Sequence, residues 1–68
     1  MVIKMSNLKK IREERGLSQN QLAKLADINP QMLKFYEQGV RDINGARAIT
    51  LYKIALALQV RIEDLLQI

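Results

Sequence analysis

The chain has 68 residues and a formal net charge of +4, with no cysteine, no histidine and an apolar share of 49%. It is therefore long enough for one domain with a modest core, and it excludes a disulfide framework, a thiolate metal site and histidine-based catalysis. No apolar run approaches the roughly 20 residues of a membrane span. We expect a soluble, cytoplasmic protein without a metal ion or cofactor. The basic charge favours an anionic partner, although charge alone is weak evidence.

The first predicted element is a helix over residues 7–15. Ser6 or Asn7 can cap its start, because both side chains can accept a hydrogen bond from a free backbone N–H. Leu8 and Ile11 are three residues apart and mark the face that we expect to be buried. The charged residues around them predict a solvated opposite face.

Two helix starts follow in tandem, and they are the most informative feature of the chain. Ser18 can cap a helix over residues 19–26, and Gln21 has the spacing that completes a capping box. Leu17 and Leu22 occupy the two positions of a hydrophobic staple, which fixes the direction in which the chain enters a helix.

The second of these starts predicts a helix over residues 30–38. Asn29 can cap it, and Pro30 suits its first turn. Ile28 and Leu33 repeat the staple spacing. Only a short turn separates the two helices. This arrangement is typical of a helix-turn-helix, in which the second helix enters the major groove of DNA.

The rest of the chain predicts two more helices, over residues 45–58 and 62–66. Asn44 can cap the longer one. Apolar residues line one side of that helix: Ile49, Tyr52, Ala55 and Leu58, with Leu51 and Ile54 widening the side. We therefore expect an all-α fold, a compact five-helix domain over residues 1–68.

Four stretches of this sequence together resemble one family. They are Leu8-x-x-Ile11-Arg12, Gly16-Leu17-Ser18-Gln19-x-x-Leu22-Ala23, Tyr36-Glu37-Gln38-Gly39 and Ala57-Leu58-x-x-x-Ile62-Glu63-Asp64-Leu65-Leu66. Over about residues 6–66 the chain is similar to the five-helix DNA-binding domain of phage repressor and Cro-type regulators, the Xre family of bacteria and phages. The resemblance implies a sequence-specific transcriptional regulator, a repressor that binds a palindromic operator in double-stranded DNA as a homodimer. It also implies a prokaryotic or phage-encoded protein that associates with the nucleoid.

The resemblance and the outward positions of the third helix define a set of candidate DNA-binding residues. They are Ser18, Gln19, Asn29, Pro30, Gln31, Lys34, Phe35, Gln38, Arg41 and Arg47. Gln31 can pair with adenine, and Lys34 can reach guanine or a phosphate. Phe35 can pack on a thymine methyl, or it can turn inward or meet another subunit. Pro30 can offer only shape or methyl contact.

Several of these residues have a structural role as the alternative. Ser18 can act simply as a cap, while the free N–H groups of that helix start form an anion site for a phosphate. In the family, the residues that match Ser18 and Gln19 bond a phosphate or the neighbouring helix. Arg41 matches the phosphate-contacting loop. Asn44 and Arg47 can approach the DNA backbone, or Asn44 can be a plain cap.

Arg12 and Glu37 match a pair that, in the family, forms a partly buried salt bridge between the first and third helices. The resemblance therefore implies a structural role for both. The chain departs from the family pattern at Asp27 and Gln59, where glycine is usual. A third departure is Arg61, where a capping residue is usual.

The apolar C-terminus exceeds what a short last helix needs for its own packing, and the surplus suggests a dimer surface. The candidate dimer contacts are Val60, Ile62, Leu65, Leu66 and Ile68. Val2 and Ile3 could form a short strand that pairs with a partner or with the C-terminus. The alternative is a frayed tail.

Two other classes of function compete with a DNA-binding regulator. Antitoxins use the same domain to neutralise a partner protein, and Met32, Phe35 and the apolar tail would then be protein contacts. An enzyme would need converging catalytic groups. The acidic pairs at residues 13–14 and 63–64 each split between two helix faces, so we expect no catalysis.

Overall fold

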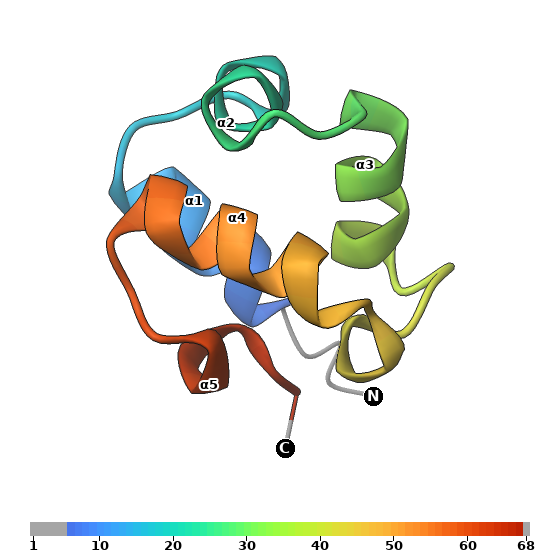
Figure 1. Ribbon diagram of the computed structural model, residues 1–68. Coiled ribbons are helices and arrows are strands. Elements are labelled where there is room, and N and C mark those ends of the chain that lie inside the picture. Colours follow the sequence, from blue (N-terminus) through green and yellow to red (C-terminus); the bar gives the residue numbers. More distant parts are fainter. Residues whose placement is uncertain (1–5, 68) are drawn as a thin grey trace, which may run out of the picture.

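The computed structural model describes residues 6–67, and every regular element in that range is a helix. In chain order they are α1 (Asn7–Glu14), α2 (Gln19–Ala26), α3 (Pro30–Gln38), the 3₁₀ helix η1 (Ile43–Gly45), α4 (Ala48–Leu58) and α5 (Ile62–Leu65). Figure 1 shows α4 crossing the middle of the domain between α2 and α5, with α3 toward the N-terminal end of α4. The expected all-α, five-helix fold is confirmed.

One hydrophobic core joins all the α-helices. Its completely buried large side chains are Leu8 of α1, Leu22 of α2, Leu33 of α3, Ile54 and Leu58 of α4, and Leu65 of α5. The helix α2 packs against both α3 and α4, and α1 packs against α3 and α5. These helices are too short to be stable alone in water, so their packing against one another stabilises the domain as a unit.

Side-chain caps begin the first three helices. Ser6 is the cap of α1, since its Oγ accepts a hydrogen bond from the Lys9 N–H at 3.1 Å. Ser18 and Gln21 form the expected capping box, with bonds of 3.1 Å to the Ser18 Oγ and 2.8 Å from the Ser18 N–H. Asn29 caps α3 by accepting from the backbone of Gln31 at 2.8 Å. Local sequence therefore specifies where these helices start.

A residue in the left-handed conformation directly follows each of α2, α3 and α4. Gly39 closes α3 with a φ of +77°, which glycine adopts at no steric cost. Asp27 after α2 and Gln59 after α4 adopt the same conformation, with φ values of +56° and +58°. Both stand where the family usually has glycine, so the fold keeps the backbone turn and accepts a less suitable residue.

The start of α4 differs from the sequence prediction. The helix begins at Ala48 rather than near residue 45, and Asn44 lies in η1, so Asn44 does not cap α4. Its side chain instead exchanges hydrogen bonds of 3.0 and 2.8 Å with the backbone of Gln67. Arg47 is the residue before α4, and its side chain makes no capping bond. A distant contact thus takes the place of the expected local one.

The predicted apolar side of α4 is also divided. Leu51, Ile54, Ala55 and Leu58 face the core, whereas Ile49 and Tyr52 are exposed. The sequence could not show this division because α4 is apolar on nearly all sides, so periodicity does not select a single buried face.

The apolar C-terminus packs mainly within the chain itself. Leu65 is completely buried in the core, while Val60, Ile62 and Leu66 are half-buried against it. The interpretation of these residues as a surplus is therefore wrong for Leu65, which a second subunit could not reach without opening the core. The expectations for Val2, Ile3 and Ile68 lie outside the described residues.

Candidate nucleic-acid interface

One face of α3 carries an exposed row of polar side chains. Gln31, Lys34 and Gln38 are all exposed and follow one another at helical spacings of three and four residues. Leu33 and Tyr36 are buried on the opposite side of the helix. Amide and ammonium groups are the side chains that match the hydrogen-bonding edges of bases in the major groove. The row therefore has the chemistry and the spacing to contact several bases along a groove.

Apolar residues accompany this row. Pro30 is exposed in the first turn of α3, where it has no polar side-chain atom to offer. Met32 and Phe35 are both half-buried. Met32 packs against the hydrophobic core, and Phe35 is not among the side chains that do.

A buried ion pair connects α1 to α3. The Arg12 Nε donates to Glu37 Oε2 at 2.7 Å and the Arg12 Nη2 donates to Glu37 Oε1 at 3.0 Å. Only 10% of the Arg12 side chain and 2% of the Glu37 side chain are exposed. The hydrogen bond to Glu37 raises the pKa of Arg12 above its usual value, so the guanidinium stays charged at any ordinary pH. A bidentate pair of this kind fixes orientation as well as distance.

The same pair also connects to α2 and to the segment before it. The Gln19 Nε2 donates to Glu37 Oε1 at 3.0 Å, and the Arg12 Nη1 donates to the Leu17 carbonyl at 2.7 Å. Gln19 thus bonds the neighbouring helix, which is one of the two roles that the resemblance implied. The four groups hold α1, α2 and α3 in one arrangement. They therefore set the angle at which α3 presents its exposed row.

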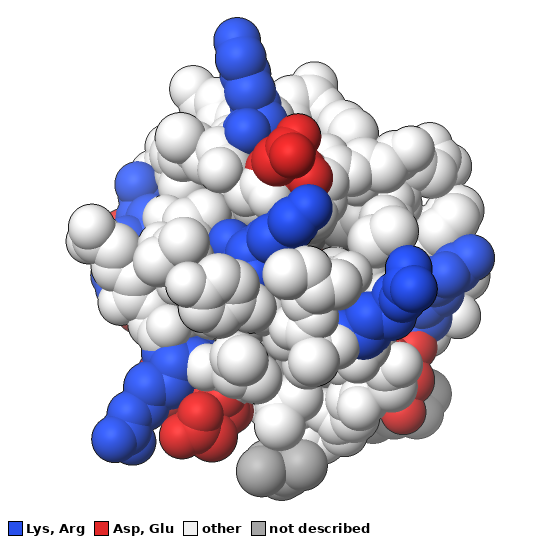
Figure 2. All heavy atoms as spheres, viewed as in Figure 1, with Lys and Arg blue, Asp and Glu red and all other residues white. Residues whose placement is uncertain are grey.

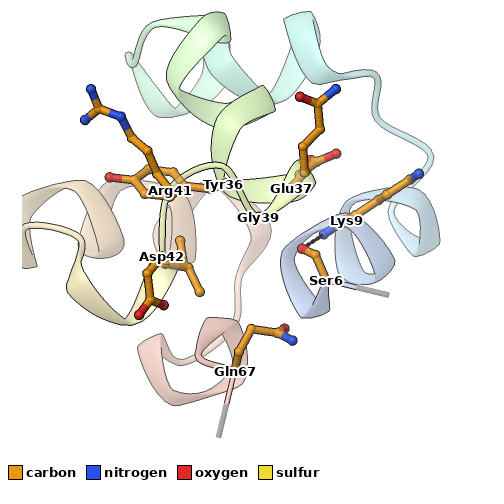
Figure 3. A pocket seen from close by; sticks show the side chains of 10 residues that line it. Ser6, Lys9, Tyr36, Glu37, Gly39, Arg41, Asp42 and Gln67 are labelled. Atoms are coloured by element: carbon orange, nitrogen blue, oxygen red, sulfur yellow. Dashed lines mark hydrogen bonds between the residues drawn. The ribbon is translucent and has the colours of Figure 1, made fainter. Parts of the chain in front are cut away.

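The segment after α3 adds exposed positive charge. Arg41 and Arg47 are both exposed, and the Arg41 N–H donates to the Phe35 carbonyl of α3 at 3.2 Å. A shallow hollow of about 590 Å³ lies between this segment, the C-terminal end of α3 and the start of α1 (Figure 3). Lys9 and Arg41 line it together with the acidic Glu37 and Asp42, so its charge is mixed. The cations here suit a phosphate at the edge of an interface better than an enclosed anion.

Two tertiary contacts that sequence reasoning missed hold the C-terminal half in place. The Arg15 Nε donates to the Leu58 carbonyl at 3.1 Å, at the C-terminal end of α4. Asn7 bonds the tail twice, because its N–H donates to Gln67 Oε1 and its Nδ2 donates to the Leu66 carbonyl. Nothing in the local pattern singles out these polar residues, since their partners are more than 40 positions away.

Among residues 6–67, no group of acidic residues lies close enough together to suggest a metal site. In the same part of the chain, none of the helices has the length and apolar character needed to span a bilayer.

Known proteins share this fold. A helix-turn-helix family model matches residues 8–65. The structure is similar to the restriction-modification controller protein C.AhdI from Aeromonas hydrophila, with a TM-score of 0.78 and 28% identity over 88% of this chain and 86% of that chain. It is also similar to SinR, the master regulator for biofilm formation, solved in complex with DNA, with a TM-score of 0.82 and 26% identity over 90% of this chain and 97% of that chain. No curated protein matched the chain. Because the family model covers most of its length, the protein belongs to the helix-turn-helix family of Xre and Cro/C1 type, whose members are DNA-binding transcriptional regulators.

Proposed function

We propose that this protein represses transcription by binding a palindromic operator as a homodimer, with α3 in the major groove. The observation that carries the proposal is the exposed row of Gln31, Lys34 and Gln38 on a helix whose orientation is held by the buried Arg12–Glu37 pair. A base-reading helix needs such rigid support, because a small misplacement breaks hydrogen bonds to base edges. SinR, which has a similar fold, was solved in complex with DNA.

Within this proposal, base readout belongs to α3. Gln31 forms a bidentate pair with an adenine, and Lys34 bonds O6 or N7 of a guanine. Phe35 packs on a thymine methyl, and Pro30 contributes shape only, so the position that it faces is read weakly. Gln38 contacts the far end of the half-site.

Phosphate contacts belong to the residues around α3. Ser18 and Gln19 lie at the N-terminal end of α2, where free N–H groups favour an anion. Asn29 directly precedes α3, and Arg41 and Arg47 come after it in the chain. Such contacts supply affinity without sequence preference. The protein then acts in the cytoplasm, at the nucleoid, and catalyses no reaction.

The test is selection of the purified chain on a pool of randomised duplexes, at low and at physiological salt, followed by sequencing. We expect enrichment of a palindrome whose half-sites are about one helical turn apart. Binding that disappears with salt and enriches no sequence would contradict the proposal, since only counterion release would then remain. In that outcome the second candidate, an antitoxin-like module for a partner protein, is favoured by the exposed apolar residues Val40, Ile49, Tyr52 and Leu56.

A further inference from the structure

The outer face of α4 carries an exposed apolar stripe that no other element of residues 6–67 covers. Ile49, Tyr52 and Leu56 are 55%, 54% and 64% exposed. They follow one another at spacings of three and four residues, which is the a–d–a pattern of a helix that packs along its length against another helix. We call these three residues the α4 stripe.

The surroundings of the α4 stripe are poor in charge. Lys53 is the one charged residue of α4, and it is half-buried. Figure 2 views the molecule from the side on which α4 lies in front: uncharged atoms cover most of this face, one Lys or Arg side chain lies near its middle with an Asp or Glu above it, and the other cations lie toward its margin. A mostly uncharged surface with cations toward its edge is compatible with a protein–protein interface, whose core is depleted of charged residues.

We propose that the α4 stripe binds the α4 stripe of a second copy of this chain, with the two helices parallel about a two-fold axis. In this arrangement Tyr52 meets Tyr52 of the partner subunit, and the position beside the stripe that faces Lys53 is the exposed, uncharged Ala48. The two lysines are therefore not opposed across the axis.

The parallel direction rests on the proposed function. The helix α3 lies toward the N-terminal end of α4 (Figure 1), so parallel α4 helices place both α3 helices at the same end of the dimer. Two recognition helices on one side can enter successive major grooves of one duplex. Antiparallel α4 helices would place them at opposite ends, where one short operator could not engage both.

The area of the α4 stripe predicts how strong the association is. Three half-exposed large side chains present roughly 300 Å² of apolar surface, within the range that monomers leave exposed as functional patches. A standard stable interface buries about 800 Å² on each partner. The free chain is therefore expected to dimerise reversibly and weakly, and two half-sites on one duplex then strengthen the pairing by holding the copies together.

Sedimentation of the free chain across a concentration series tests this surface with two matched variants. Leu56→Lys places a charge opposite its own copy, while Leu25→Lys makes the same change at a leucine of α2 that is equally exposed, at 63%. We expect Leu56→Lys to raise the dimer dissociation constant at least about tenfold, with normal helical circular dichroism, and Leu25→Lys to leave it within about twofold. Equal effects of the two variants, or a wild-type chain that stays monomeric at about 1 mM, would overturn the proposal.

Single cysteines test the direction, because the natural chain has none. Under mild oxidation Ile49→Cys should cross-link to its own copy in the parallel dimer, and Leu25→Cys should not. A mixture of Ile49→Cys and Leu56→Cys chains that cross-links only between the two kinds would indicate antiparallel helices and overturn the arrangement.

Duplexes with one or two half-sites separate this inference from the proposed function. Leu56→Lys should bind a duplex with a single half-site as tightly as the wild type does. It should lose most of the increase in affinity that a second half-site gives the wild type. If the variant kept that increase, the proposed dimer contact at the α4 stripe would be refuted, and the proposed repressor function would stand. If the chain dimerised through α4 but selected no operator, the repressor function would be refuted and the dimer contact would stand.

Discussion

Different kinds of contact position the α2–α3 unit and the α4 segment. Each helix of the α2–α3 unit begins with a side-chain cap, at Ser18 and at Asn29. The helix α4 has no side-chain cap at Arg47, and contacts distant in sequence hold its surroundings: Arg15 with the Leu58 carbonyl, and Asn44 with Gln67. Residues close in sequence therefore specify where α2 and α3, the recognition unit, begin, whereas the position of α4 depends on the assembled domain.

The largest effect is expected in the network that joins α2 and α3 to α1. Glu37→Ala leaves the Arg12 guanidinium buried without its carboxylate, and should lower the free energy of unfolding by about 3–5 kcal/mol. Urea unfolding followed by circular dichroism measures this change. The raised pKa of Arg12 stabilises the fold at every pH below its usual pKa, and this contribution is lost only as the pH rises through the folded value, so the result should not vary between pH 6 and 9.

The double variant Arg12→Met, Glu37→Leu provides the control for that measurement. Removing both charges leaves neither unpaired, so it should be less destabilising than Glu37→Ala alone. If Glu37→Ala lowered the free energy of unfolding by less than about 1 kcal/mol, the Arg12–Glu37 pair would not stabilise the packing of α1 with α2 and α3.

The two sides of α4 offer the next largest contrast. Leu58 is completely buried and Leu56 is mostly exposed, although they are two residues apart. Leu58→Ala should cost about 2–5 kcal/mol of unfolding free energy, and Leu56→Ala under about 0.5 kcal/mol, when dilute chains are unfolded without DNA. Similar losses for both would mean that α4 is rotated from the orientation described.

The exposed row of α3 provides a prediction on binding. Gln31→Ala should weaken binding to the selected operator by about 1–3 kcal/mol while nearly preserving binding to unrelated duplexes. Lys34→Ala should show the same loss if it reads guanine, and a uniform loss on all sequences if it contacts a phosphate. Fluorescence anisotropy on both kinds of duplex measures the difference. An equal loss for Gln31→Ala on every sequence would refute base reading by that residue.

Much of the recognition unit could be predicted because its signals are close in sequence. The staples at Leu17 and Leu22 and at Ile28 and Leu33, with a cap between each pair, predict two helix starts whatever the rest of the chain does. The start of α4 could not be predicted in this way. Asn44 is a good capping residue whose partner, Gln67, is 23 positions away, and only the folded chain brings them together.

The candidate site shows the same division. The residues of the exposed α3 row could be predicted from helical spacing, since Leu33 and Tyr36 identify the buried side. The bond from Gln19 to Glu37 was one of two alternatives, and spacing could not choose between them. The exposure of Ile49 and Tyr52 was missed because a helix that is apolar on nearly all sides gives no preferred face.

Smaller effects on stability are expected at the cap residues of α2 and α4. Ser18→Ala removes the Oγ that accepts from Gln21, and should cost about 1 kcal/mol of unfolding free energy. Arg47→Ser adds an acceptor where α4 has none, and should add about 0.5–1 kcal/mol if the new hydroxyl reaches a free N–H. Thermal and urea unfolding of the two variants measure the changes. A gain at Ser18 or a loss at Arg47 would contradict the view that a side chain caps α2 and that none caps α4.

The smallest effect is expected at the end of α4. Gln59 holds a left-handed conformation that costs a side-chain-bearing residue about 1–2 kcal/mol, and glycine removes this strain but gives the unfolded chain more freedom. Gln59→Gly should therefore add about 0.5–1 kcal/mol to the free energy of unfolding. Asp27→Gly should add less, because aspartate tolerates this conformation better. Ala57→Gly, two residues earlier and inside the helix, should instead cost about 1 kcal/mol. If Gln59→Gly destabilised the chain as much as Ala57→Gly does, the left-handed conformation of Gln59 would not be strained in the folded protein, and residue 59 would tolerate it as well as glycine does at residue 39 after α3.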